Sequence, residues 1–352
     1  MKVLLRRRGW HVKRPTMADI ARRAGVSKVA VSYALNDQPG VSEGTRASIK
    51  AIAEELGWRP NSAARALSGA RAQAVGLVVR RPARTLGVEQ FFMEFVSGIE
   101  GVLSGRSYAL MLQMVETHQQ ETAVHRRWWG EGRVDGVFLV DLHSADTRVH
   151  AVEELGLPAV VVGPPGTSGS LPSVWSDDGE SVREIVRYLA ALGHRRVARV
   201  AGPVELAHTA ERDAAMLDVC REAGLPEPAV VHTDYTGDEG ARAARRLLIG
   251  PDRPTAMVFD NDIMAVAALS VAQELRLDVP ADLSIVAWDE SPLTRVVRPA
   301  LSAVSRDIPA YGARAAEALL ASVAGERVAD VREGPARLVP RGSTSPPRTG
   351  TG

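Results

Sequence analysis

The stretch Pro15-Thr-Met-Ala-Asp-Ile-Ala-Arg-Arg-Ala-Gly-Val-Ser-Lys-Val-Ala-Val-Ser-Tyr-Ala-Leu-Asn36 has the apolar spacing of two short helices joined by a sharp turn. Gly25 stands where the chain must turn, and Ser27 can cap the second helix. The apolar positions are Ile20, Ala21 and Ala24 on the first helix and Val29, Ala30, Val31 and Leu35 on the second. This pattern is typical of a helix-turn-helix, whose second helix enters the DNA major groove.

A third helix follows the pair. It is expected to begin at Ser42, a good N-cap residue, and to end at Gly57. Its apolar residues Ile49, Ile52, Ala53 and Leu56 would close a small core. After a proline stop, residues 60–69 predict a helix of about two turns, which is too short to be stable in isolation.

Charge is divided unevenly along the 352 residues. The first 71 residues carry 14 Lys and Arg against 5 Asp and Glu, a net charge of +9. The remainder carries 29 Lys and Arg against 37 Asp and Glu, a net charge of −8. This asymmetry favours a polyanion-binding head on a body that does not bind polyanions, with a solvated basic tail as the alternative.

From Ala74 onward, short apolar strands alternate with amphipathic helices such as residues 182–192 and 239–248. The expected strands are residues 75–79, 108–112, 136–140, 159–162, 197–201, 256–259 and 283–287. Repeated strand-helix units predict a doubly wound parallel α/β fold, and their number indicates two sheets. Ligands of such folds lie beyond the carboxyl ends of the strands or in the cleft between lobes.

The residues from Thr16 to Asn36, together with Val41-Ser-Glu-Gly-Thr-Arg and Leu56-Gly-Trp-Arg-Pro-Asn-Ser-Ala-Ala-Arg-Ala-Leu, resemble the LacI/GalR family of repressors. The likeness continues through Leu192-Gly-His-Arg-Arg-Val-Ala, Phe259-Asp-Asn-Asp-Ile-Met-Ala and Trp288-Asp289. It implies an all-α helix-turn-helix domain followed by a two-lobed effector domain similar to periplasmic sugar-binding proteins.

The resemblance assigns the DNA contacts. Residues Lys28, Val29 and Tyr33 fall on positions that read base edges, and Thr16, Ser27, Ser32 and Asn36 fall on positions that touch phosphates. The chemistry agrees, because Lys28 can donate to guanine and Val29 can pack on a thymine methyl. The alternatives are core packing for Val29 and partial burial for Tyr33.

The resemblance also implies a hinge helix that forms when two copies pair on an operator. Leu67 matches a leucine that is wedged into the minor groove, and Ala64 matches a neighbouring minor-groove position. Simple packing of Leu67 within the linker is the alternative.

For the effector, the resemblance places Arg212, Asn261 and Asp289 on polar contact positions and Trp175 and Tyr235 on aromatic ones. Such groups suit a sugar, because carboxylate, amide and guanidinium groups satisfy hydroxyls while aromatic faces stack on a ring. Hinge or core packing is the alternative for the two aromatic residues. A mutual salt bridge is the alternative for Arg212 and Asp289.

Two regions depart from the family pattern. Gly163, followed by Pro164 and Pro165, stands where some sugar-responsive members have an aspartate. The first lobe diverges around residues 80–92, so Phe92 is the one effector contact that we assign there.

Catalysis is not expected. No Gly-x-Gly-x-x-Gly follows the first strand, and neither a Gly-Lys-Ser/Thr phosphate loop nor a Gly-x-Ser-x-Gly elbow occurs. The lone Cys220 excludes an intrachain disulfide and a multi-cysteine metal site. Asp260 and Asp262 are read as loop carboxylates rather than as metal ligands, so no metal and no cofactor is predicted.

These observations predict a cytoplasmic, nucleoid-associated repressor that contains no membrane span. It would bind a pseudo-palindromic operator as a homodimer, because no heptad leucine tail follows to build a tetramer. A small-molecule effector, most simply a carbohydrate, would control its affinity for DNA. The alternative is a C-terminal domain that binds a protein partner. The expected parts are a basic extension (1–14), the helix-turn-helix domain (15–60), the hinge helix and linker (61–72), the effector-binding and dimerisation domain (73–342) and a C-terminal tail (343–352).

Overall fold

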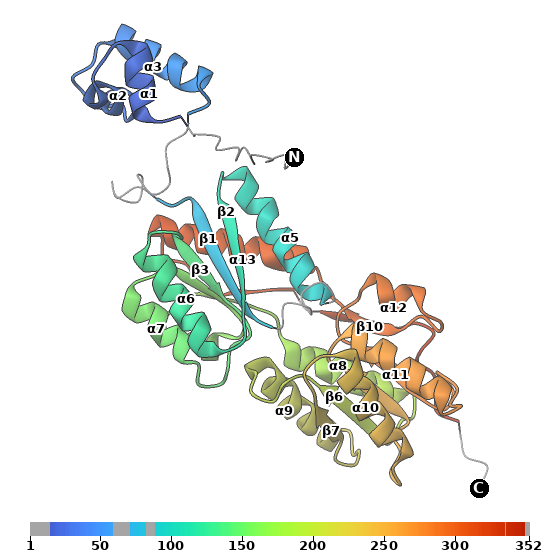
Figure 1. Cartoon of the computed structure of the whole chain (residues 1–352). Coiled ribbons are helices and arrows are strands. Elements are labelled where there is room, and N and C mark those ends of the chain that lie inside the picture. The colour runs from blue at the N-terminus through green and yellow to red at the C-terminus, as the bar shows by residue number, and fades with distance from the viewer. Residues whose placement is uncertain (1–14, 59–70, 82–88, 335, 349–352) are drawn as a thin grey trace, which may run out of the picture. The chain divides into compact units, whose positions relative to one another are not determined.

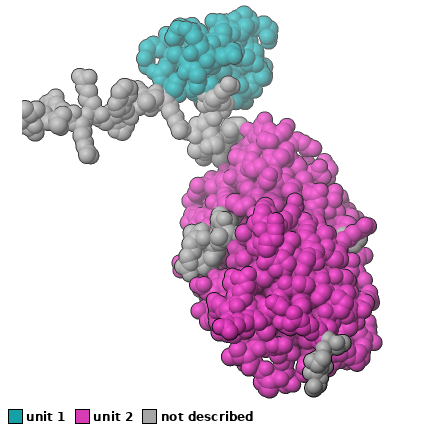
Figure 2. Space-filling view, turned by 90° about the vertical axis from the view of Figure 1, so that its right-hand side faces the viewer, with its two compact units in different colours: residues 1–70 teal, residues 71–352 magenta. Residues whose placement is uncertain are grey.

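The computed structural model describes residues 15–58, 71–81, 89–334 and 336–348. The chain forms two compact units, residues 1–70 and residues 71–352 (Figures 1 and 2). The expected basic extension and the minor-groove residues Ala64 and Leu67 lie outside the described residues. In the described ranges, no helix combines the length and the apolar character that crossing a bilayer requires.

The described part of the first unit is a three-helix core. Its helices are α1 (Met17–Ala24), α2 (Lys28–Leu35) and α3 (Glu43–Glu55). Ser27 caps the N-terminus of α2, and its Oγ accepts a hydrogen bond from the Ala30 amide at 3.1 Å. Gly25 ends α1 and turns the chain with a φ of 67°. The side chains of Ile20, Val31, Ala34 and Ile49 are completely buried between the helices.

Arg46 of α3 fixes the carboxyl end of α2. Its guanidinium donates to the carbonyl oxygens of Tyr33, Ala34 and Gln38 at 3.2, 3.3 and 2.9 Å, and pairs with Asp37 at 3.4 Å. A cation beside the last carbonyls of a helix satisfies acceptors that have no partner within the helix. The orientation of α2 is therefore set by polar contacts as well as by the apolar core.

The second unit contains two α/β lobes, as the sequence predicted (Figure 1). The first lobe has a parallel sheet with the strand order β11-β5-β4-β3-β1-β2. Helices α5 and α13 cover one face, and α6 and α7 cover the other. Successive residues of β1 point to opposite faces, so Leu77 packs under α5 while Val78 packs under α6. The elements of this lobe are β1 (Ala74–Arg80), α5 (Gln90–Gly105), β2 (Ala109–Val115), α6 (His118–Gly130), β3 (Gly136–Leu139), α7 (Thr147–Leu155), β4 (Ala159–Val162), the 3-10 helix η1 (Pro165–Thr167), β5 (Ser173–Trp175), α13 (Ile308–Ala324) and β11 (Val331–Arg332).

The second lobe repeats this plan with the strand order β12-β10-β9-β8-β6-β7, in which β12 alone runs antiparallel to its neighbour. Helices α8 and α9 pack on one face, and α10 and α11 pack on the other. The elements are α8 (Asp178–Ala191), β6 (Val197–Ala201), α9 (Ala207–Glu222), β7 (Ala229–His232), α10 (Gly237–Ile249), β8 (Ala256–Phe259), α11 (Asp262–Glu274), β9 (Ser284–Ala287), α12 (Pro292–Val296), β10 (Ser302–Ser305) and β12 (Arg337–Val339).

The chain passes between the lobes three times. The crossings lie between β5 and α8, between β10 and α13, and between β11 and β12. The first lobe is therefore assembled from two separate stretches of sequence. Helix α13 returns to pack on α5, where Gly98 permits close approach: a Cβ there would lie 1.9 Å from the Pro309 carbonyl oxygen.

The residues expected as a C-terminal tail pack on the second lobe as far as Arg348. Ser343 is completely buried, and its Oγ donates to the Ile285 carbonyl at 2.6 Å and accepts from the Ser302 amide at 2.8 Å. Arg348 pairs with Asp278 at 2.8 Å. The body of the second unit thus continues beyond the expected boundary at residue 342, because Ser343 supplies hydrogen bonds to buried backbone groups of β9 and β10.

Two valines of α2 give a matched test of this packing. We expect Val31→Ala to lower the stability of the helical unit by about 1–2 kcal/mol, because it removes two buried carbon atoms. Val29→Ala should change stability by less than about 0.5 kcal/mol, because Val29 is 59% exposed. Hydrogen exchange of the α1–α3 amides measures both changes, and equal effects would contradict the assignment of the two faces.

Candidate functional site

Helix α2 presents a solvent-exposed face that carries the residues predicted to read bases. Lys28 is exposed, Val29 is 59% exposed and Tyr33 is 39% exposed. Ser32 lies one helical turn after Lys28, and Asn36 lies one turn after Ser32. The Asn36 side-chain amide donates to Ser32 Oγ at 3.4 Å. The alternative prediction that Val29 packs in the core is wrong, because Val31 and Ala34 are the buried residues of α2.

The two remaining predicted phosphate contacts lie at helix N-termini. Thr16 precedes α1, and its hydroxyl donates to Asp19 at 2.7 Å, while Ser27 precedes α2. Free amides and the helix dipole make such ends favourable for phosphate groups. The predicted base contacts therefore lie on α2, and the predicted phosphate contacts lie on α2 and at the N-termini of α1 and α2.

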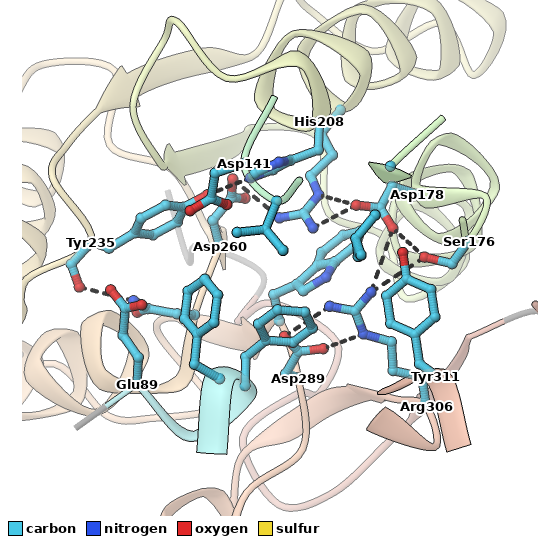
Figure 3. Close-up of a pocket in the computed structure, with 18 of the residues that line it drawn as sticks. Glu89, Asp141, Ser176, Asp178, His208, Tyr235, Asp260, Asp289, Arg306 and Tyr311 are labelled. Carbon is cyan, nitrogen blue, oxygen red and sulfur yellow. Dashed lines mark hydrogen bonds and ion pairs between the residues drawn. The ribbon is translucent and has the colours of Figure 1, made fainter. Parts of the chain in front are cut away.

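A pocket lies between the lobes of the second unit (Figure 3). Its volume is about 130 Å³, roughly ten times what one water molecule needs, so it can hold a small molecule. Aromatic side chains and ion pairs alternate around it. Its lining comprises Arg81, Glu89, Gln90, Phe91, Phe92, Val140, Asp141, Leu142, Val162, Gly163, Pro164, Ser176, Asp178, Ala207, His208, Glu211, Arg212, Tyr235, Asp260, Asn261, Asp262, Ile263, Trp288, Asp289, Ser291, Arg306 and Tyr311.

Arg212 of α9 is the centre of the largest ion-pair group. The residue is 4% exposed; its Nε donates to Asp178 at 2.8 Å, and its Nη1 lies 3.5 Å from Asp260. The guanidinium also stacks 3.8 Å from the centre of the Trp288 ring. Burial alone would lower the pKa of Arg212, but the two carboxylates raise it above its usual value. The group therefore stays charged inside the pocket.

A second pair joins the pocket to the hinge. Arg306 lies in the crossing after β10 and binds both carboxylate oxygens of Asp289, at 2.7 and 3.1 Å. It also donates to Ser176 Oγ, in the crossing after β5, at 3.2 Å. Two of the three inter-lobe connections are thus tied together beside the pocket (Figure 3).

The first lobe contributes a third pair. Arg81 lies 3.2 Å from Glu89 and 2.8 Å from Asp141, and its guanidinium faces the Phe92 and Tyr235 rings at 5.8 and 5.4 Å. Burial would raise the pKa of Asp141, but the adjacent Arg81 lowers it below its ordinary value. This lobe is therefore charged on its pocket face as well.

Tyr235 is held from three sides. Its hydroxyl is hydrogen-bonded to His208 Nε2 at 2.8 Å, and its carbonyl accepts from the Asn261 amide at 2.8 Å. A Cβ on Gly202 would lie 2.1 Å from the ring, so glycine is required there. Burial and the nearby Arg212 together lower the pKa of His208 to about 4, so this imidazole is neutral at pH 7.

Three pocket residues other than glycine have left-handed backbone conformations. Asp141, Tyr235 and Asp289 have φ of 51°, 69° and 59°. Such residues cost free energy, and they are concentrated at binding sites where the surrounding structure holds them in place. Each follows a strand or connects two elements at the edge of the pocket.

The pocket contains five of the six residues that the sequence assigned to the effector: Phe92, Arg212, Tyr235, Asn261 and Asp289. Trp175 is not among the lining residues. It belongs to β5, where the Arg332 guanidinium lies 5.2 Å from its ring, so its packing is that of the hinge alternative. Arg212 and Asp289 each form ion pairs, but with other partners rather than with each other.

Sequence reasoning missed a large share of the pocket. The missed polar and aromatic residues are Arg81, Glu89, Gln90, Phe91, Asp141, Ser176, Asp178, His208, Glu211, Asp260, Asp262, Trp288, Ser291, Arg306 and Tyr311. Asp260 and Trp288 directly follow strands and Asp141 lies two residues after β3, so the rule that ligands bind beyond strand ends could have found them. Arg306 and Asp178 lie in or beside hinge crossings, which local patterns did not reveal. Within the described ranges, no group of His, Cys, Asp and Glu has the arrangement of a metal site.

Two family models match parts of the chain. Residues 16–61 match the model of bacterial regulatory proteins of the lacI family, and residues 186–344 match a periplasmic binding protein-like domain. The HTH-type transcriptional regulator CelR of Thermobifida fusca is 32% identical over 324 residues, which are 91% of this chain and 95% of CelR.

Solved structures give the same result. A CelR–cellobiose complex aligns with a TM-score of 0.72 and 30% identity over 94% of this chain and all of that one. The lac repressor dimer bound to operator and the anti-inducer ONPF aligns with a TM-score of 0.81 and 26% identity over 95% of this chain and all of that one. These relatives are named as regulators and not as enzymes, which agrees with the absence of catalytic motifs. The chain belongs to the lacI family of bacterial transcription regulators.

Proposed function

We propose that this protein is a repressor that binds a pseudo-palindromic operator as a homodimer and that a small polyhydroxylated effector in the inter-lobe pocket controls this binding. The observation that carries the proposal is the pocket itself, in which fixed carboxylate and guanidinium groups from both lobes surround aromatic rings. Hydroxyl groups satisfy such acceptors and donors, and sugar rings pack on aromatic faces. The relative crystallised with cellobiose supports a carbohydrate.

The proposed route from effector to DNA runs through the hinge. Arg306 and Ser176 belong to inter-lobe crossings and also line the pocket, so a bound molecule contacts the segments about which the lobes move. A ligand that binds one lobe arrangement more tightly shifts the population toward it. The coupling free energy of such systems is typically about 1–3 kcal/mol. The alternative of a protein partner gives no reason for ionised groups inside a small pocket.

The experiment that tests the proposal is operator selection with the purified chain, followed by titration of the selected duplex in the presence of mono- and disaccharides. We expect one pseudo-palindromic motif, and a change of at least about fivefold in operator affinity with at least one sugar. A chain that prefers no duplex over random competitor would contradict the DNA-binding part. A chain with normal operator binding and no response to any small molecule would contradict the effector part.

Two lysines of the helical unit test the DNA-reading face. Lys28→Ala should relax specificity at one position of each half-site by about 1–3 kcal/mol, because a lysine donor to a base edge is lost. Lys50→Ala should leave base preference unchanged, since Lys50 lies on α3 and pairs with Asp37 at 2.7 Å. Selected motifs that are identical for wild type and Lys28→Ala would contradict the assignment.

Asp289→Asn tests the effector contact. Asparagine tolerates the left-handed backbone at this position and keeps the side-chain shape, so the fold should persist. The sugar concentration for half-maximal change in operator binding should rise at least about tenfold, because a charged acceptor is lost. Operator affinity without sugar should stay the same. Asp218→Asn, an exposed change on α9, is the control. An unaltered sugar response of Asp289→Asn would contradict the assignment of Asp289 as an effector contact.

Arg212→Ala tests the buried ion pairs. We expect a loss of about 3–5 kcal/mol in the free energy of unfolding of the second unit, because Asp178 and Asp260 would lose a partner inside the protein. Arg221→Ala, on the exposed side of the same helix, should cost less than about 0.5 kcal/mol. Urea unfolding measures both, and equal midpoints would contradict the importance of this network.

A further inference from the structure

The pocket has an excess of negative charge. Its described lining contains the arginines Arg81, Arg212 and Arg306 against seven carboxylates, which are Glu89, Asp141, Asp178, Glu211, Asp260, Asp262 and Asp289. His208 does not offset this excess, because its pKa of about 4 leaves it neutral at pH 7. The undescribed residues 82–88 contain a single charged residue, an arginine, which cannot by itself offset an excess of four.

None of the three lining arginines is available to an anion. Arg81 pairs with Glu89 and Asp141, and Arg306 pairs with Asp289. Arg212 is shared between two more carboxylates. Arg199, which is not a lining residue, binds Asp260 but also pairs with Asp213, which lies outside the lining too. A phosphorylated or carboxylated effector would therefore enter a pocket whose positive groups are already used.

Asp262 has one carboxylate oxygen that accepts no hydrogen bond from the described residues. It is the first residue of α11 and is 6% exposed, yet its Oδ2 has no hydrogen-bond partner among the described residues. A buried carboxylate oxygen without a donor is costly, which indicates that a ligand supplies the donor. Burial raises the pKa of Asp262 above its ordinary value and the neighbouring Asp289 adds to this, although hydrogen bonds from Ser291 and from backbone amides oppose the rise.

Glu89 faces the same region from the other lobe. It precedes α5, and Arg81 is its only ion-pair partner among the described residues, a partner that it shares with Asp141. Burial raises the pKa of Glu89, while Arg81 lowers it, and the charges of Asp141 and Asp262 raise it again. One carboxylate from each lobe thus contributes to the uncompensated charge.

We infer that the effector is a polyhydroxylated cation, an amino sugar in chemical class, whose ammonium group pairs with Asp262 and Glu89. This inference rests on the proposed function and specifies the charge of its ligand. An ammonium group supplies three donors and one positive charge, whereas the hydroxyls of a neutral sugar supply donors alone. Because Glu89 and Asp262 come from different lobes, the bound ammonium would also favour the arrangement in which the lobes are close together.

The test compares ligands that differ at one substituent. Isothermal titration of the full chain would use glucose, glucosamine, N-acetylglucosamine and glucose 6-phosphate, together with cellobiose and the corresponding disaccharide of glucosamine. In at least one size class, the amine should bind with a Kd at least about tenfold lower than its neutral counterpart, because an ion-paired hydrogen bond replaces a neutral one. N-acetylation should abolish the advantage, and the phosphate should not bind.

Tighter or equal binding of a neutral or phosphorylated sugar would overturn the inference, as would failure of both amines to bind. These failures are distinguishable from failure of the proposed function. If a neutral sugar binds at least as tightly as the amine and changes operator affinity, the regulator function stands and only the charge assignment fails. If no small molecule binds and operator affinity never changes, both proposals fail.

Variants locate the ammonium group. Asp262→Asn and Glu89→Gln should each reduce the preference for the amine over the neutral sugar at least about tenfold, because the amide that replaces the carboxylate carries no charge. Asp238→Asn is the matched control, because Asp238 also lies in the first turn of a helix of the second lobe but is exposed. If Asp262→Asn does not fold, Glu89→Gln decides, and an unchanged preference in that variant overturns the assignment.

Discussion

Pairing of buried guanidinium groups with carboxylates is the constraint on which the second unit depends. Arg199 and Arg212 are 0% and 4% exposed, and an isolated charge at such sites would cost several kcal/mol. Asp260, at the carboxyl end of β8, accepts from Arg199 at 2.8 and 2.7 Å and from the Gly202 amide at 3.1 Å. The network therefore joins β6 and β8 to helix α9 through one carboxylate.

The same network reaches the hinge. Arg212 binds Asp178, the first residue of α8, which begins directly after the chain has crossed from the first lobe. Arg306 lies 3.9 Å from the same carboxylate and belongs to the second crossing. The polar groups of the pocket are thus held in place before any ligand arrives, which lowers the entropic cost of binding. They also lie beside the segments that connect the lobes.

Local chemistry made much of this architecture predictable. The turn at Gly25, the cap at Ser27 and the apolar spacing of three short helices were sufficient for the first unit, because such helices are determined by neighbours in sequence. The central strands of both sheets were equally clear, since they are continuous apolar runs. Strands β5, β11 and β12 have two or three residues each, and the apolar runs of β7 and β10 have only three and two residues, so no period could reveal them.

The pocket was predictable only in part for a related reason. Residues assigned through a family motif, such as Arg212 and Asp289, lie in the pocket, whereas their ion-pair partners depend on which distant elements the crossings bring together. Asp178 lies 34 residues from Arg212, and Arg306 lies 17 residues from Asp289. Trp175 shows the opposite error, because its aromatic ring fits a ligand contact but its short strand, which pairs with β11, directs it to the hinge. Exchange of strands between lobes is a property of the whole chain, which local patterns do not encode.

That exchange has a consequence for how the protein is made. Helix α13 and strand β11 complete the first lobe, yet they are encoded after nearly the whole of the second lobe. During translation, one face of the first sheet is therefore covered by α5 alone while residues 178–305 emerge and fold. A nascent chain that stops within the second lobe leaves Phe95, Ile99 and Leu103 of α5 without the helix that buries them, so premature termination yields an aggregation-prone fragment instead of a free-standing first lobe.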